Sequence, residues 1–296
     1  MMDKTPPQIV LSASRRSDIP AFYMPWFMDG IHRGAFSVKN PYTSRCFTIP
    51  ADTASVHSIV FWSKNYGPFL AADYARQLMD QGYHLFFNFT VNTPDALLEP
   101  GVPSLAARLS QMADIARRVT PAALQWRFDP IVYYRRTDGK IVNNIGAFEE
   151  IADVAAACGV TRCITSFMDH YPKTRRRWHG HPGSAFVDPP LAEKIAVLRW
   201  MTGLLTVRGM ALYACCESGL LTDLPKDIPI APASCIPSDL LMGIYGGCLS
   251  LARDRGQRRA AGCGCRVARD IGSYTDHPCF HNCRFCYANP AEAPKE

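Results

Sequence analysis

Six short runs of apolar, β-type residues recur along the chain, and each run ends in polar residues. Most runs are separated by segments with the three-to-four-residue apolar period of an amphipathic helix. The predicted strands are Ile9–Ser14, Ser58–Trp62, His84–Thr90, Leu124–Trp126, Cys163–Phe167 and Met210–Ala214. The predicted helices between them are Phe69–Gln81, Ser104–Val119, Gly146–Cys158 and Leu191–Arg208.

Alternating strands and helices predict right-handed βαβ units and therefore an α/β fold with a parallel sheet. Parallel barrels carry their chemistry at the C-terminal strand ends, where this chain has its polar residues. We therefore predict a partial (β/α)6 TIM-like barrel. The alternative is a doubly wound open sheet with ordinary polar loops. It is disfavoured because no G-x-G-x-x-G motif follows any predicted strand.

The predicted organisation has three parts. Residues 1–219 form the partial barrel, and residues 220–252 form a linker, rich in Pro, Asp and Ala, with a last helix at Ser238–Ala252. Residues 253–296 form a cysteine-rich iron–sulfur lobe with little regular structure. Because the cysteines lie so close to the end of the chain, we expect this lobe to fold back over the barrel mouth.

Composition indicates a soluble globular protein, since 48% of the 296 residues are hydrophobic and 20% are charged. Met1–Gln8 lacks the apolar core of a secretory signal, and no apolar run is long enough to span a membrane. We therefore expect a cytoplasmic protein without a membrane partner. The net charge of +6 is compatible with a nucleic-acid or phosphorylated substrate but does not require one. Twelve cysteines in a cytoplasmic chain indicate metal or redox chemistry.

Three cysteines near the C-terminus, Cys279, Cys283 and Cys286, have C-x3-C-x2-C spacing, and Phe285 precedes the third. Three thiolates on a tight loop can bind three irons of a 4Fe–4S cluster and leave the fourth iron open to a cofactor or substrate. The alternative is zinc in a Cys3His tetrahedron, because His277 and His281 flank the triad.

The pattern C-x3-C-x-aromatic-C resembles the signature of the radical S-adenosylmethionine (radical SAM) enzymes. The continuation Cys-Tyr-Ala-Asn-Pro at 286–290 is similar to the branch that contains spore photoproduct lyase and the DNA repair photolyase-like proteins. The chain also resembles an uncharacterised bacterial family with a Ser-Ala-Ser-Arg-Arg start, here at 12–16, and a cysteine-rich end. It departs from most radical SAM enzymes in one respect: its triad ends ten residues before the C-terminus instead of near the N-terminus.

The resemblance implies a reduced 4Fe–4S cluster that cleaves SAM to a 5′-deoxyadenosyl radical, with electrons from a ferredoxin- or flavodoxin-type donor. The substrate is not indicated. The run Val267–Tyr274 would supply the strand that precedes the cluster loop, so the strand order would look circularly permuted. The alternative function is a non-catalytic binding protein stabilised by zinc or an iron–sulfur cluster.

A second metal site is predicted from the remaining cysteines. Cys263, Cys265, Cys235 and one of the Cys215–Cys216 pair would together supply four thiolates for a second cluster or a zinc ion. We prefer Cys216, which adjoins Glu217, because strand alternation would turn the two neighbouring thiols to opposite faces. The alternative is that these are reduced, buried cysteines. Three further cysteines, Cys46, Cys158 and Cys248, have no partner pattern.

Polar residues at the strand ends complete the predicted site. Arg15 and Arg16, with Asp18, would bind the SAM carboxylate or a substrate phosphate; the alternative is an ion pair with Asp18 in a turn before Pro20. The resemblance adds Phe285 and Tyr287 as cofactor contacts. The candidate catalytic residues are Lys64, Arg127, Asp129 and Glu217. Arg127 and Asp129 could instead be a buried pair that closes the barrel rim.

Two basic runs, Lys173–Arg177 followed by His179 and His181, and Arg253–Arg259, are the sequence features that could contact nucleic acid. Trp178 follows the first run, so base stacking combined with phosphate pairing is one interpretation. Most charge runs are solvated surfaces, and that is the alternative.

Overall fold

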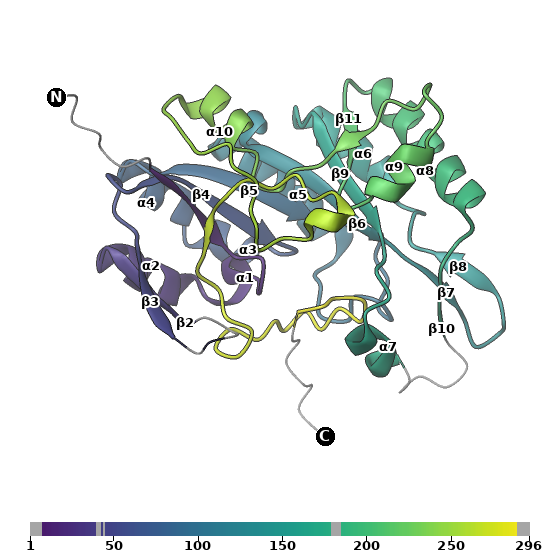
Figure 1. Cartoon of the computed structure of the whole chain (residues 1–296), viewed down its shortest axis with the longest axis horizontal. Coiled ribbons are helices and arrows are strands. Elements are labelled where there is room, and N and C mark those ends of the chain that lie inside the picture. The colour runs from purple at the N-terminus through teal and green to yellow at the C-terminus, as the bar shows by residue number, and fades with distance from the viewer. Residues whose placement is uncertain (1–7, 40–42, 44, 179–184, 289–296) are drawn as a thin grey trace.

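A computed structural model describes residues 8–39, 43, 45–178 and 185–288. Its main element is a sheet of eight parallel strands in the order β12-β11-β9-β6-β5-β4-β1-β13 (Figure 1). These strands are β1 (Ile9–Ala13), β4 (Val56–Ser63), β5 (His84–Thr90), β6 (Leu124–Ile131), β9 (Arg162–Phe167), β11 (Ala211–Ala214), β12 (Ala231–Pro232) and β13 (Arg269–Asp270).

The α/β prediction and all six predicted strands are confirmed. From β1 to β11 the strands follow one another across the sheet in chain order, whereas a doubly wound sheet reverses its direction partway. The doubly wound alternative is therefore wrong. The two edge strands, β12 and β13, are not paired with each other among the described residues, so the sheet is open. Both edge strands come from the segments predicted as linker and cysteine-rich lobe.

The four predicted helices between the strands also form. They correspond to α3 (Gly67–Ala71) with α4 (Tyr74–Asp80), α5 (Leu105–Arg118), α6 (Phe148–Ala157) and α8 (Leu191–Thr206). The first splits in two because Asp73, between α3 and α4, adopts a left-handed φ of 54°. The helix predicted at Ser238–Ala252 is α10 (Ser238–Tyr245); it ends early because Gly246 has a φ of 75°, outside helical geometry.

Several elements have no counterpart in the prediction. They are the helices α1 (Ile19–Phe22), α2 (Met24–His32), α7 (Pro172–Trp178) and α9 (Ser218–Asp223), the short 3₁₀ turns η1 (Pro121–Ala123) and η2 (Arg259–Ala261), the hairpin β2 (Ala35–Lys39) with β3 (Cys46–Pro50), and the small sheet of β10 (Ala185–Val187), β7 (Tyr133–Arg135) and β8 (Ile141–Asn143).

The two faces of the main sheet have different coverings. Because side chains alternate along a strand, Leu11 and Phe61 pack with the helices on one face, while Val10 and Val60 pack on the other. That second face is covered by α10 and by residues 253–288, which we call the C-terminal segment. This segment runs across the front of the sheet in Figure 1. This path brings Cys263 and Cys265 against that face of the sheet. None of the described helices is long and apolar enough to cross a membrane.

Candidate functional site

A cavity of about 970 Å³ lies where the C-terminal ends of the central strands meet the C-terminal segment. Its wall combines residues at the C-terminal ends of β1, β4, β6 and β11 with the cysteines near the end of the chain. The predicted site residues on this wall are Arg15, Arg16, Asp18, Lys64, Arg127, Asp129, Cys216, Cys235, Cys263, Cys265, Cys279, Cys283, Phe285, Cys286 and Tyr287. The structure thus brings nearly the whole predicted set together.

Glu217 is the predicted site residue that does not line the cavity. It stands at the N-terminus of α9, and its Oε1 accepts a hydrogen bond of 2.7 Å from the backbone N–H of Phe167. Burial raises the pKa of its carboxyl to about 7. Its observed contact joins β9 to the segment after β11.

Asp18 ties the triad loop to the strand ends. Its Oδ1 caps α1 by accepting from the N–H of Ala21 at 3.0 Å. Its Oδ2 accepts from the Ser63 hydroxyl, the Lys64 N–H and His281 Nε2, at 2.8 to 2.9 Å. The expected turn before Pro20 is therefore present, but the Asp18 carboxylate in it pairs with His281 from the C-terminal segment.

The two arginines before Asp18 have other partners. Arg15 Nη1 donates to Asp254 at 2.9 Å, and Arg16 Nη1 donates to the Gly272 carbonyl at 3.0 Å. The alternative of an ion pair between either arginine and Asp18 is wrong for the described contacts. The guanidinium of Arg15 keeps two buried nitrogens, Nε and Nη2, without a hydrogen-bond partner.

The histidines beside the triad are engaged elsewhere. His281 Nδ1 lies 2.9 Å from the Gly101 carbonyl oxygen and Nε2 lies 2.8 Å from Asp18, so both nitrogens face oxygen acceptors. His277 Nδ1 accepts from the Ser273 N–H, and its ring packs on Trp26. Among the described residues, no three His, Cys, Asp or Glu side chains are grouped to hold one metal ion. A mononuclear Cys3His zinc site therefore fits poorly.

The three triad thiols suit a cluster better, since each thiolate of a cubane binds a separate iron and the sulfurs need not converge on one point. Burial raises the pKa of Cys279 to about 12, and it also raises the pKa of Cys283 and Cys286. The Lys64 ammonium opposes this effect at all three thiols. Metal binding must displace these protons, and Lys64 provides positive charge beside the resulting thiolates.

Lys64 is held in place by the residues around it. Its Nζ donates to Glu99 Oε1 at 2.6 Å and lies 5.4 Å from the centre of the Phe285 ring. Phe285 itself is buried in an apolar cluster with Leu98 and Cys283. Tyr287 is partly exposed, and its hydroxyl donates to the Arg15 carbonyl at 3.1 Å.

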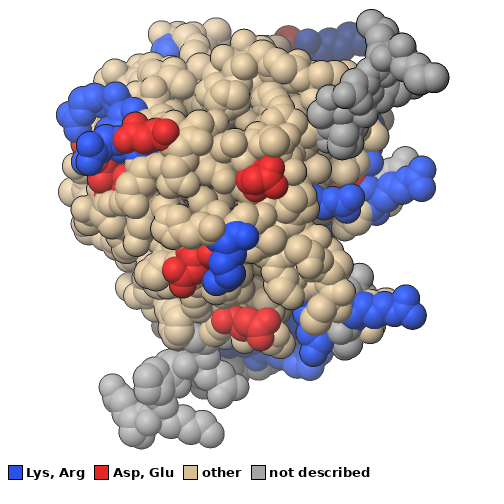
Figure 2. Space-filling view, turned by 90° about the vertical axis from the view of Figure 1, so that its left-hand side faces the viewer, with Lys and Arg blue, Asp and Glu red and all other residues tan. Residues whose placement is uncertain are grey.

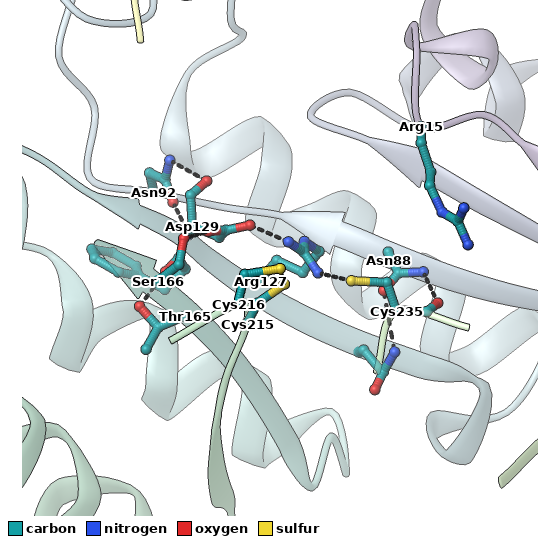
Figure 3. Close-up of polar contacts among 12 residues, drawn as sticks. Arg15, Asn88, Asn92, Arg127, Asp129, Thr165, Ser166, Cys215, Cys216 and Cys235 are labelled. Atoms are coloured by element: carbon teal, nitrogen blue, oxygen red, sulfur yellow. Dashed lines mark hydrogen bonds and ion pairs between the residues drawn. The ribbon is translucent and has the colours of Figure 1, made fainter. Parts of the chain in front are cut away.

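Arg127 bridges two of the predicted groups (Figure 3). Its Nη1 donates to Cys235 Sγ at 2.7 Å, and its Nη2 donates to Asp129, which also accepts from Ser166. Burial works against the charged form, but Cys235 and Asp129 outweigh it and raise the pKa of Arg127 well above its ordinary value. The buried Arg127–Asp129 pair is thus formed, and it lies on the cavity wall.

Cys215 lines the cavity, although the sequence analysis set it aside in favour of Cys216. Its sulfur lies 3.8 Å from that of Cys216, and both line the cavity. The expectation that strand alternation separates the two thiols is wrong, because Cys216 follows the end of β11 and adopts a left-handed φ of 59°. The adjacent pair Cys215–Cys216 was the sequence feature that could have indicated a role for both thiols. As expected, Cys46, Cys158 and Cys248 are absent from the cavity wall.

Trp178 does not support base stacking. It is 4% exposed and packs against Tyr134 and Phe186, so it belongs to a core cluster. The preceding Arg177 donates to the carbonyls of Cys286 and Ala288. His179, His181 and positions 289 and 290 of the motif lie outside the described residues. On the face drawn in Figure 2, the described Lys and Arg residues are scattered among acidic and uncharged ones.

Comparison with protein families gives a match to the family described as "Domain of unknown function (DUF1848)", over residues 10–288. The matched region includes both groups of cysteines. A search of the curated proteins found no match.

Proposed function

The chain belongs to the DUF1848 family, and we propose that it is a radical SAM enzyme whose cluster is held by Cys279, Cys283 and Cys286. The observation that carries the proposal is the site of the triad: one buried and two partly buried thiols on the wall of a large cavity at the C-terminal strand ends, beside the partly buried cation Lys64. Parallel α/β proteins place ligands at this end of their strands.

The position of β13 supports the same proposal. It lies within the predicted run Val267–Tyr274, precedes the triad loop and pairs in parallel with β1. Counted from this edge of the sheet, the first strand is β13, which the triad loop follows in the chain, and the second strand is β1. This is the circularly permuted arrangement that the resemblance to radical SAM enzymes implies, and it suits a partial barrel wall.

When bound and reduced, such a cluster would supply the one-electron reductive cleavage of SAM by which radical SAM enzymes remove a hydrogen atom from a substrate. A ferredoxin- or flavodoxin-type donor would supply the electron. Within the protein, the three thiolates would bind three irons, and Lys64 would offset their negative charge. Phe285 and its apolar cluster exclude water from one side of the site.

Arg15 is the proposed anion-binding residue. It lines the cavity, it stacks 5.8 Å from the Trp62 ring centre, and two of its buried nitrogens lack partners. Buried guanidinium nitrogens without hydrogen-bond acceptors are costly, so a carboxylate or phosphate is the ligand that they favour. Arg127 already binds Cys235 and Asp129, and its proposed role is to orient them. The substrate class that these charges favour carries phosphate, as a nucleic acid or a phosphorylated metabolite does.

The test is anaerobic reconstitution with iron and sulfide, followed by reduction with dithionite and addition of SAM. We expect a brown protein, a change in its electron paramagnetic resonance (EPR) spectrum on adding SAM, and slow formation of 5′-deoxyadenosine measured by chromatography. The variant Cys279→Ala/Cys283→Ala/Cys286→Ala should lose all SAM-dependent signals. A fully loaded, reduced cluster that neither binds SAM nor yields 5′-deoxyadenosine would instead support the non-catalytic iron–sulfur binding protein.

Arg15→Ala provides a second test of the same proposal. We expect it to weaken SAM or substrate binding by about 2 kcal/mol or more while the spectrum of the cluster stays unchanged. The control is Arg117→Ala, because that side chain is exposed on α5. Equal SAM affinity in both variants would remove Arg15 from the binding site and leave the cluster assignment intact.

A further inference from the structure

Five cysteines outside the triad are gathered in one group. Cys215 and Cys216 have their sulfurs 3.8 Å apart. Cys215, Cys235, Cys263 and Cys265 are buried in a single packed cluster on the second face of the sheet, and Cys216 packs against that cluster. All five line the same cavity as the triad. We call this group the thiol ring.

The backbone brings three distant segments together to make the thiol ring. Cys215 and Cys216 follow β11, Cys235 follows β12, and the other two come from the C-terminal segment. The left-handed φ of Cys216 turns its thiol towards that of Cys215. Between Cys263 and Cys265, a Cβ on Gly264 would lie 2.5 Å from the Ala233 carbonyl oxygen, so only glycine permits this approach to β12.

Three guanidinium groups lie beside the thiol ring. Arg127 donates to Cys235 Sγ at 2.7 Å (Figure 3), Arg258 interacts with Cys216, and Arg15 interacts with Cys265. These cations would offset the negative charge of thiolates, which are the form in which cysteine binds metal.

The number and arrangement of the thiols select the kind of metal centre. A tetrahedral zinc ion takes four ligands around one point, whereas the described residues contain no group of three that converges on a single ion. A 4Fe–4S cluster spreads four thiolates over four irons. We propose that four thiols of the ring bind a second iron–sulfur cluster, which faces the same cavity as the triad. This proposal does not depend on SAM chemistry at the triad.

The test uses the triad variant Cys279→Ala/Cys283→Ala/Cys286→Ala, reconstituted anaerobically with ferrous iron and sulfide. We expect it to retain about four iron and four sulfide per chain and an EPR signal after reduction that SAM does not change. Adding Cys263→Ser/Cys265→Ser leaves three ring thiols, one fewer than the proposed cluster binds, and should lower this iron well below four per chain. The matched addition Cys158→Ser/Cys248→Ser, at two cysteines outside the cavity, should not.

Two results would overturn the proposal: a folded triad variant without iron, or one with only stoichiometric zinc. If the triad variant does not fold, the wild-type protein decides the question. Its iron content should be about eight per chain and should fall to about four in Cys263→Ser/Cys265→Ser, with the SAM-sensitive EPR signal kept. A wild-type content of about four iron that this double variant leaves unchanged would refute the second cluster and leave the triad assignment standing.

Discussion

Charge next to the triad is balanced by a small group of buried side chains. Lys64 and Arg108 both face Glu99, at 2.6 and 4.0 Å, and Asn92 donates to the same carboxylate. The side chains of Glu99 and Arg108 are 3% and 1% exposed. Two cations against one carboxylate leave positive charge beside Cys283, which suits a loop whose thiols become anionic when metal binds.

At the scale of this residue group, Glu99→Gln should destabilise the metal-free protein by about 3–5 kcal/mol, because it leaves two buried cations without their counter-charge. Urea unfolding measures the change. The control, Asp114→Asn, breaks an exposed pair with Arg117 and should cost less than about 1 kcal/mol. Cluster loading should recover part of the Glu99→Gln loss, because the thiolates then supply negative charge. If both variants lost the same free energy of unfolding, the pairing of Glu99 with Lys64 and Arg108 would not stabilise the protein more than an exposed ion pair does.

At the scale of elements, the triad loop has little regular structure and is held by the loop after β5. Two backbone hydrogen bonds join them, from Gly101 N–H to the His281 carbonyl and from Arg284 N–H to the Leu98 carbonyl, both at 3.0 Å. A Cβ on Gly101 would lie 2.4 Å from the Phe280 carbonyl oxygen. The close approach of the two loops therefore requires glycine at position 101.

Gly101→Ala should accordingly push the triad loop away, lower stability by about 1–3 kcal/mol and reduce the iron bound at the triad. Thermal unfolding and iron analysis check both effects. Gly203→Ala in α8 is the control, since nothing lies within 4 Å of its added Cβ and alanine stabilises a helix by about 0.5–1 kcal/mol. If Gly101→Ala bound iron normally and matched this control in stability, the two loops would not be coupled.

At the scale of the whole molecule, the central strands and the C-terminal segment differ in how they are held. Strands β4, β5 and β6 lie inside the sheet, whereas the edge strands β12 and β13 span two residues each. The C-terminal segment carries five of the eight cysteines assigned to the two sites. The local stability of this segment should therefore depend on bound metal more than the local stability of the central strands does.

Hydrogen exchange followed by mass spectrometry tests this difference. In metal-free protein we expect the slowest exchange in β4, β5 and β6 and faster exchange across residues 253–288. Iron–sulfur loading should slow exchange in that segment, because a ligand that binds only the folded state stabilises it. If verified loading left exchange there unchanged, the cysteines of the segment would not be the ligands.

Local pattern determined the central strands of the main sheet and the helices between them, and it also singled out the triad as a candidate site. Apolar periodicity predicts six of the eight strands of the main sheet and four intervening helices, because burial on one face imposes that period on neighbouring residues. The spacing of Cys279, Cys283 and Cys286 likewise lies within one loop.

The path of the chain in three dimensions decided the remaining features. Asp18 meets His281 across 263 residues, Trp178 is buried, and Glu217 lies off the cavity wall. Cys215 joins Cys216 only because the backbone turns left-handed after β11. Such contacts depend on packing between distant segments, and no local period or spacing encodes that packing.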